Sequence, residues 1–257
     1  MTEVVQPLII WTLQRTGGTN LGKHLLNLTR YPVKHEPFNK PREYGFVTKE
    51  WLRDSDLLAT ATNIKEALDK PQSIKHCVEM VPPQVSECVA DVSASRNFSN
   101  LFLFRENSLQ RVLSMEYARR TKVWGPSHER PDETNDPAFD NPIDPEALFN
   151  HELMSLTRLN SIWLHLAASR ARLHSISFEQ IYEANFDDAG IALSKVLDFV
   201  GIPLCEEKLG IMLSNLRDVG NQKTRDRYVR FEGRKDLENK LLELPEFEFF
   251  TSTPISL

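Results

Sequence analysis

The chain has 257 residues, of which 40% are hydrophobic and 26% charged, and its formal net charge is −5 at pH 7. This composition is that of a globular protein with a substantial core, and the negative charge argues against a dedicated nucleic-acid binder, which would present a strongly basic face. No apolar run approaches the roughly 20 residues needed to cross a bilayer, and the N-terminus lacks a secretion signal, so we expect a soluble cytoplasmic protein without a transmembrane segment. We expect a single domain over residues 1–257. The sequence leaves its oligomeric state open.

Strand-like and helix-like patterns alternate along the chain. Residues 7–13 (PLIIWTL) form a short apolar run typical of a buried strand, and glycines followed by a helical pattern (LGKHLLNL) come next. The alternation recurs, with strands predicted at 73–80, 100–104 and 173–178 and helices at 81–94, 106–120 and 188–203. This order predicts an α/β fold with a central parallel sheet and helices on both faces.

A segment rich in proline, aspartate and asparagine, residues 125–145, separates the third and fourth strands. We interpret it as a loop insertion, and loops of this length are either functional lids or disordered insertions, so both readings stay open. Asp144 before Pro145 predicts the N-cap of a long helix that runs to about Arg172.

The three cysteines, Cys77, Cys88 and Cys205, lack the paired spacing of a zinc site and are expected to be free thiols.

The first loop, QRTGGTNL (residues 14–21), carries several groups that can bind an anion. A glycine turn before a helix presents unpaired N–H groups and the positive end of the helix dipole, and Arg15, Thr16 and Thr19 add a guanidinium and two hydroxyls. The letters GGTNLGKH nearly match the phosphate loop of ATPases and GTPases, but His24 stands where that loop needs Ser or Thr to ligate Mg²⁺. The loop predicts a phosphate or sulfate site, with a plain structural turn as the alternative.

The same loop resembles the 5′-phosphosulfate loop of sulfotransferases that use 3′-phosphoadenosine 5′-phosphosulfate (PAPS), in particular their bacterial and carbohydrate-type branch. In that family an arginine at a strand end and a serine on the next helix bind the 3′-phosphate, and residues 100–118 (NLFLFRENSLQRVLSMEYA) offer Arg105 and Ser114. Residues 176–203 resemble a later strand and helix of the family. The resemblance implies a P-loop-kinase-like sulfotransferase fold, PAPS as cofactor, 3′-phosphoadenosine 5′-phosphate (PAP) as product, and no metal.

The resemblance also implies the roles of individual residues, with Lys23 left as an ordinary helix residue. The residues implied in cofactor binding are Arg15, Thr16, Gly17, Gly18, Thr19, Asn20, Arg105 and Ser114. Arg15 is also expected to act in catalysis, by stabilising charge on the leaving phosphate.

Two residues are candidates for the base that takes the proton of the acceptor hydroxyl. Glu36 resembles the Glu-Pro step after the first helix in carbohydrate-acting and bacterial sulfotransferases, and we favour it; its alternative is a surface ion pair with Lys34 or Lys40. His76 lies roughly where cytosolic sulfotransferases carry a Lys-Thr-His step, and its alternative is a satisfied histidine on a buried strand. The acceptor is expected to be a sugar or a small hydroxylated metabolite.

Other features stay open. The basic segment 220–235, with Lys223, Arg225 and Arg227, either contacts the nucleotide or forms a solvated surface. The adenine ring requires an apolar or aromatic slot, for which Trp11, Trp51 and Phe38 are candidates. Two other functions compete: a P-loop nucleotide kinase or ATPase, and a non-catalytic nucleotide-binding protein of the same fold.

Overall fold

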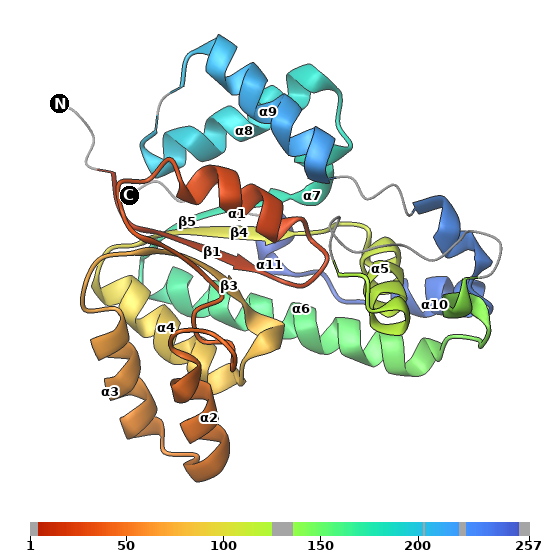
Figure 1. Cartoon of the computed structure of the whole chain (residues 1–257), viewed down its shortest axis with the longest axis horizontal. Helices are drawn as coiled ribbons and strands as arrows, with labels where there is room; N and C mark the ends of the chain where they lie inside the picture. Colours follow the sequence, from red (N-terminus) through yellow and green to blue (C-terminus); the bar gives the residue numbers. More distant parts are fainter. Residues whose placement is uncertain (1–4, 125–135, 203, 221–224, 252–257) are drawn as a thin grey trace.

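The computed structural model describes residues 5–124, 136–202, 204–220 and 225–251. The chain folds around a five-stranded, all-parallel sheet with the order β2-β3-β1-β4-β5 (Figure 1). The strands are β1 (Leu8–Thr12), β2 (Val33–His35), β3 (Ser73–Cys77), β4 (Ser99–Phe104) and β5 (Arg172–Ser177). Helices cover both faces, so the predicted fold class is confirmed. The short edge strand β2 was not predicted, because its three residues, VKH, carry no apolar run.

The helices form a layer on each side of the sheet and a third group beside it (Figure 1). One face is covered by α1 (Gly18–Leu26), α7 (Phe178–Tyr182), α8 (Phe186–Val200) and α9 (Glu206–Gly220). The other side holds α2 (Gly45–Asp54), α3 (Leu57–Ala67), α4 (Pro83–Ser95), α6 (Pro145–Ala168) and α11 (Glu248–Thr251). The third group consists of α5 (Ser108–Thr121), α10 (Arg234–Leu241) and the 3₁₀ helices η2 (Pro137–Phe139) and η3 (Arg225–Arg230).

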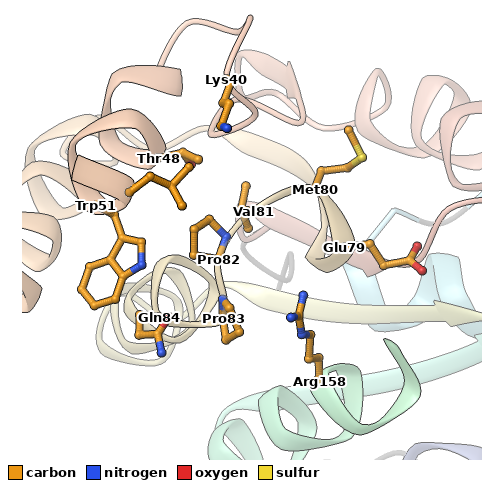
Figure 2. Close-up of a pocket in the computed structure, with 11 residues that line it drawn as sticks. Lys40, Thr48, Trp51, Glu79, Met80, Val81, Pro82, Pro83, Gln84 and Arg158 are labelled. Carbon is orange, nitrogen blue, oxygen red and sulfur yellow. The ribbon is translucent and has the colours of Figure 1, made fainter. Parts of the chain in front are cut away.

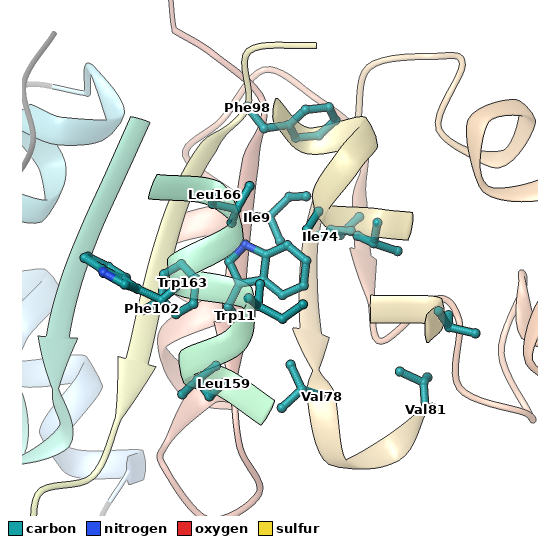
Figure 3. Close-up of a cluster of buried hydrophobic side chains, with 14 of the residues drawn as sticks. Ile9, Trp11, Ile74, Val78, Val81, Phe98, Phe102, Leu159, Trp163 and Leu166 are labelled. Carbon is teal, nitrogen blue, oxygen red and sulfur yellow. The ribbon is translucent and has the colours of Figure 1, made fainter. Parts of the chain in front are cut away.

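Alternation along β1 divides the core between the two faces, because successive side chains of a strand point to opposite sides. Leu8 and Ile10 pack with α1, α8 and α9, whereas Ile9 and Trp11 pack with α4 and α6. Figure 3 shows the second cluster, in which the ring of Trp11 lies 6.1 Å from that of Phe102. A strand that is buried on both faces is usually a continuous apolar run, which is why residues 7–13 are recognisable in the sequence.

Local signals placed several boundaries correctly. Asp144 caps α6, with its carboxylate accepting a hydrogen bond from the Ala147 N–H at 3.0 Å. Gly201, with φ of 76°, ends α8 as expected of a left-handed C-cap. The prediction that α6 extends to about Arg172 is wrong: Arg170 has φ of 55°, which breaks the helix, and Arg172 already belongs to β5.

The predicted strand 73–80 was too long. It ends at Cys77, and the short 3₁₀ helix η1 (Val78–Met80) follows before the Pro82-Pro83 pair that precedes and starts α4. The three cysteines are free. No helix in the described ranges combines the length and the apolar character required to cross a membrane.

Candidate anion-binding and catalytic site

Polar residues gather at the carboxyl edge of the sheet. The glycine loop follows β1, Glu36 follows β2, Arg105 follows β4 and Phe178 follows β5. Because all strands are parallel, these ends lie at one edge, and β1 lies between β3 and β4, where the chain changes its direction across the sheet. Ligands of open α/β proteins bind at such a switch point.

The loop leads directly into α1, which begins at Gly18 with Gly17 as its N-cap. Gly17 has φ of 78°, and a Cβ on it would lie 2.9 Å from the ring of Tyr182, so both the backbone and the space require glycine. Within the described chain, the N–H groups of Gly18 and Thr19 have no hydrogen-bond acceptor. Free N–H groups at the positive end of a helix favour an anion.

Arg15 connects this loop to α5. Its Nε donates to Oγ of the buried Ser114 at 2.8 Å, and its Nη1 donates to the carbonyl of Trp124 at 2.9 Å. Arg15 has φ of 64°, a conformation that a residue with a side chain adopts only at a cost. The structure therefore brings together Arg15 and Ser114, which the sequence had assigned to opposite ends of a nucleotide.

Arg105 is 8% exposed and lacks a full set of partners. Its Nη2 donates to Gln110 at 3.1 Å, its guanidinium lies 4.3 Å above the ring of Phe178, and its Nε has no hydrogen-bond partner among the described residues. The carboxylate of Glu179 lies 3.7 Å from Nε and that of Glu183 lies 3.8 Å from Nη2, so both form ion pairs with Arg105 but no hydrogen bond. A buried guanidinium that is incompletely bonded is costly, and an anion would reduce that cost.

Glu179 has another role. Its two oxygens accept the N–H groups of Glu106 and Asn107 at 2.9 and 3.1 Å, so it fixes the turn between β4 and α5. Burial lowers the pKa of Arg105, although the carboxylates of Glu179 and Glu183 oppose this effect, and the nearby Arg15 adds a smaller lowering. The two guanidiniums are therefore close enough to affect each other's ionisation.

Two of the predicted loop residues point away from this site. Thr16 is buried, donates to the Leu13 carbonyl at 2.8 Å and lies 2.5 Å from the Thr12 hydroxyl. Asn20 donates to the carbonyl of Leu216 at 2.7 Å. Both side chains fix the loop and α1 in place, so any contact of these residues with an anion has to use the backbone.

Glu36 is paired with a lysine that the sequence analysis missed. Lys75, buried on β3, lies 2.6 Å from the Glu36 carboxylate and also donates to Thr19 of the loop at 3.0 Å. Burial alone would raise the pKa of Glu36, but Lys75 outweighs it and the pKa is lowered, so the carboxylate is ionised at neutral pH. The missed signal was a lysine within an apolar strand, which is costly unless it is paired.

The other candidate base lies in the core. Alternation along β3 places His76 on the face opposite Lys75, where it is 1% exposed, 2.9 Å from the Ser86 hydroxyl and edge-on to Trp11. Burial lowers its pKa to about 4. Trp11 and Phe38 are fully buried in the same cluster, so neither offers a face to adenine.

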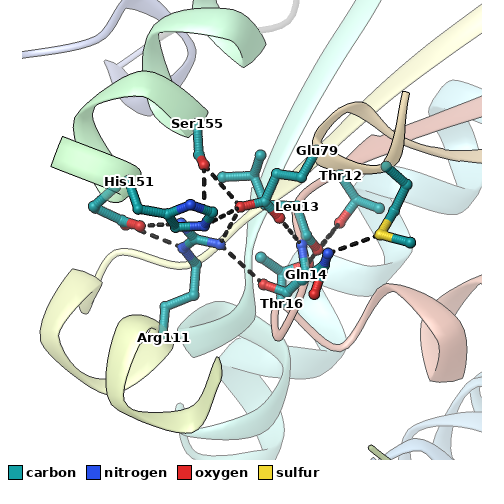
Figure 4. A network of polar contacts seen from close by, with 10 residues as sticks. Thr12, Leu13, Gln14, Thr16, Glu79, Arg111, His151 and Ser155 are labelled. Carbon is teal, nitrogen blue, oxygen red and sulfur yellow. Dashed lines mark hydrogen bonds and ion pairs between the residues drawn. The ribbon is translucent and has the colours of Figure 1, made fainter. Parts of the chain in front are cut away.

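A buried charged network holds the start of the loop (Figure 4). Glu79 accepts the N–H of Gln14, and Arg111 donates to the Gln14 carbonyl at 3.1 Å and to Glu79 at 3.1 Å. Arg111 also pairs with Glu152, and both side chains are fully buried. Both backbone groups of the residue before Arg15 are therefore clamped. Nothing in the sequence indicates this network, because its members are far apart along the chain.

Glu79 predicts a dependence of stability on pH. Burial alone would raise its pKa, but Arg111 and hydrogen bonds from His151, Gln14 and Ser155 hold it at about 2, below the usual 4.5. Ionised Glu79 therefore stabilises the fold fully above about pH 4.5, and this contribution is lost as the pH falls toward 2. We expect the free energy of unfolding, measured by urea denaturation, to fall between about pH 5 and about pH 3. A Glu79→Gln variant that shows the same fall would contradict the assignment.

Comparison with known proteins gives limited guidance. No protein-family model matches the chain, and no curated protein sequence matches it. Among solved structures, mouse sulfotransferase SULT7A1 in complex with PAP aligns with a TM-score of 0.47 and 11% identity, over 84% of this chain. The chain spans 65% of the length of that protein. Similarity at this level does not determine function, which has to be argued from the site.

Parts of the predicted site lie outside the described residues. They are Lys223, the side chains of Arg225 and Arg227, and residues 125–135 of the predicted insertion. No cluster of three or more His, Cys, Asp or Glu side chains suited to a metal ion occurs in the part of the chain that the structure describes.

Proposed function

We propose that this protein transfers the sulfuryl group of PAPS to a hydroxyl of a small-molecule acceptor. The observation that supports this most strongly is the pair of arginines at the carboxyl edge: Arg15 is bonded to Ser114, and the Nε of Arg105 has no hydrogen-bond partner among the described residues. Arg15 belongs to the same loop as the free N–H groups of Gly18 and Thr19. PAPS carries a phosphosulfate and a separate phosphate, and guanidiniums and helix N-termini are the groups that bind such anions.

In this proposal the donor is held at both ends. The N–H groups of Gly18 and Thr19 and the Arg15 guanidinium bind the 5′-phosphosulfate, while Arg105 and Ser114 bind the 3′-phosphate. The hydrogen bond between Arg15 and Ser114 keeps the two halves within reach of one molecule. Most of the binding free energy thus comes from anion contacts that the fold has already oriented.

The transfer itself requires a base and stabilisation of the leaving group. Glu36 takes the proton of the acceptor hydroxyl as its oxygen forms the new bond to sulfur. The bond between sulfur and the 5′-phosphate oxygen breaks, and its electron pair stays on that oxygen, next to Arg15 and the loop N–H groups. Lys75 acts as a positioning residue, because it keeps Glu36 ionised and ties it to Thr19. His76, on the opposite face, has no part in this proposal.

A nucleotide kinase is the second candidate, and the geometry disfavours it. In a P-loop the lysine stands where the helix begins, whereas α1 begins at Gly18 and the exposed Lys23 follows five residues later, about 7.5 Å along the axis. Strand β4 is followed by Arg105 and not by an aspartate that could hold Mg²⁺.

Calorimetry with PAP, and separately with ATP and Mg²⁺, tests the proposal. We expect PAP to bind at least about tenfold more tightly than ATP with Mg²⁺, and Arg105→Gln to weaken PAP binding by about 10- to 100-fold, since charged hydrogen bonds are lost. Arg119→Gln, on the exposed side of α5, is the matched control and should leave PAP affinity unchanged. Preference for ATP with Mg²⁺, or equal PAP affinity in the Arg105 variant, would overturn the assignment.

A further inference from the structure

A pocket of about 460 Å³ opens beside the glycine loop (Figure 2). Its walls come from α2, η1, the start of α4 and α6, and they combine polar and apolar surface; the apolar lining residues are Trp51, Leu52, Met80, Val81, Pro82 and Pro83. This volume is within the range of roughly 300–1,000 Å³ for pockets that hold small organic ligands.

Two of the lining residues connect the pocket with segments of the proposed site. On one side Met80 contacts Gln14, whose Nε2 is 2.7 Å from the Met80 sulfur, and Gln14 immediately precedes Arg15. On the other side Lys40 directly follows the turn 36–39, in which the Asn39 N–H donates to the Glu36 carbonyl at 3.0 Å. The lining is thus connected to the residue before Arg15 and to the turn that begins at Glu36.

The charged lining residues make the pocket electropositive. Lys40 and Arg158 lie at opposite ends of it in Figure 2, and among the described residues neither forms an ion pair. The one contact described for the Arg158 guanidinium is the Met154 sulfur at 3.6 Å. Glu79, the acid in the lining, pairs with Arg111, which it shares with Glu152, so the lining carries two cations and one anion. Two cations without partners above an apolar floor favour a ligand that carries a negative charge.

On the basis of the proposed function, we propose that this pocket binds the acceptor. The acceptor is an amphipathic hydroxyl compound with a flat apolar body and an anionic group. The body packs on Trp51 and the prolines, the anion pairs with Lys40 or Arg158, and the hydroxyl is directed to Glu36. A neutral sugar fits less well, because it would place hydroxyls against apolar walls and leave both cations unpaired. Of the two acceptors expected from the sequence, a sugar or a small hydroxylated metabolite, this proposal favours the second.

Calorimetry on the full chain, with and without PAP, tests this with three probes: a hydroxynaphthoate, the corresponding naphthol without the carboxylate, and glucose. We expect the hydroxynaphthoate to bind about tenfold more tightly than the naphthol, and glucose to bind more weakly than both. Lys40→Gln and Arg158→Gln should each weaken the hydroxynaphthoate about three- to fivefold, as for partly exposed charge pairs, and leave the naphthol unchanged. Lys49→Gln, an exposed lysine of α2 outside the pocket, should change nothing.

Three results would overturn the inference. The hydroxynaphthoate does not bind, the naphthol or glucose binds as tightly or more tightly, or the preference for the hydroxynaphthoate over the naphthol persists in both Lys40→Gln and Arg158→Gln. PAP affinity, measured on the same samples, separates this failure from that of the proposed function. Failure to bind PAP, with charge-dependent binding of the hydroxynaphthoate, would refute the donor assignment and leave the pocket's ligand class intact. Binding of PAP without charge-dependent binding of the hydroxynaphthoate would refute the ligand class alone.

Discussion

Replacing Glu36 by glutamine is expected to lower the rate of sulfuryl transfer by about 10²- to 10⁴-fold, the usual contribution of a general base. Glutamine has nearly the same shape and can still accept a hydrogen bond from Lys75, but it cannot take up the acceptor's proton. PAP affinity should therefore change by less than about twofold, since the donor contacts are untouched. The measurements are transfer from labelled PAPS under saturating conditions and PAP calorimetry on the same preparation.

Two further variants make this prediction specific. Glu43→Gln removes an exposed glutamate that pairs with Lys34, and the rate should not change. Lys75→Met keeps the carboxylate but removes the cation that lowers its pKa, so the acidic limb of the rate profile should move to higher pH. An undiminished rate in Glu36→Gln would exclude Glu36 as the base.

Replacing Arg111 by methionine is expected to lower the free energy of unfolding by about 3–5 kcal/mol, the cost of leaving a buried charge without its partner. Glu79 and Glu152 would both remain buried, and Arg111 is the cation that pairs with each of them. Urea denaturation followed by circular dichroism measures the change. Arg119→Met removes an exposed arginine whose buried partner, Glu116, keeps its ion pair with Arg120, and it should cost no more than about 1 kcal/mol.

A triple variant separates stability from positioning of the loop. Combining Arg111→Met with Glu79→Leu and Glu152→Leu removes all three charges, and apolar replacement of a buried ionic cluster is often neutral, so most of the lost stability should return. Transfer should stay impaired, because Gln14 has lost the partners of both its N–H and its carbonyl. A loss below about 1 kcal/mol in Arg111→Met would show that the network does not stabilise the fold.

Much of the fold could be read from short stretches of the chain. The strands β1 and β4 are buried on both faces, and their apolar runs, residues 8–11 and 101–104, stand out from the helical patterns around them. Gly201 and Asp144 end and begin helices through their own backbone and side-chain chemistry. The glycine loop was recognisable for the same reason, because Gly17 needs a positive φ directly before a helix. Such features depend on a few neighbouring residues, and the sequence contains them completely.

The composition of the site depended on contacts between distant segments. The register of β3 against β1 decides which side chain faces the loop. It turns Lys75 toward Thr19 and the next residue, His76, into the core. Arg15 and Ser114 are 99 residues apart, and Arg111 and Glu152 are 41 apart. The order of strands and the packing of α5 and α6 decide which charged groups become neighbours, and burial then decides which of them need a partner. The spacing of residues along the chain carries neither piece of information.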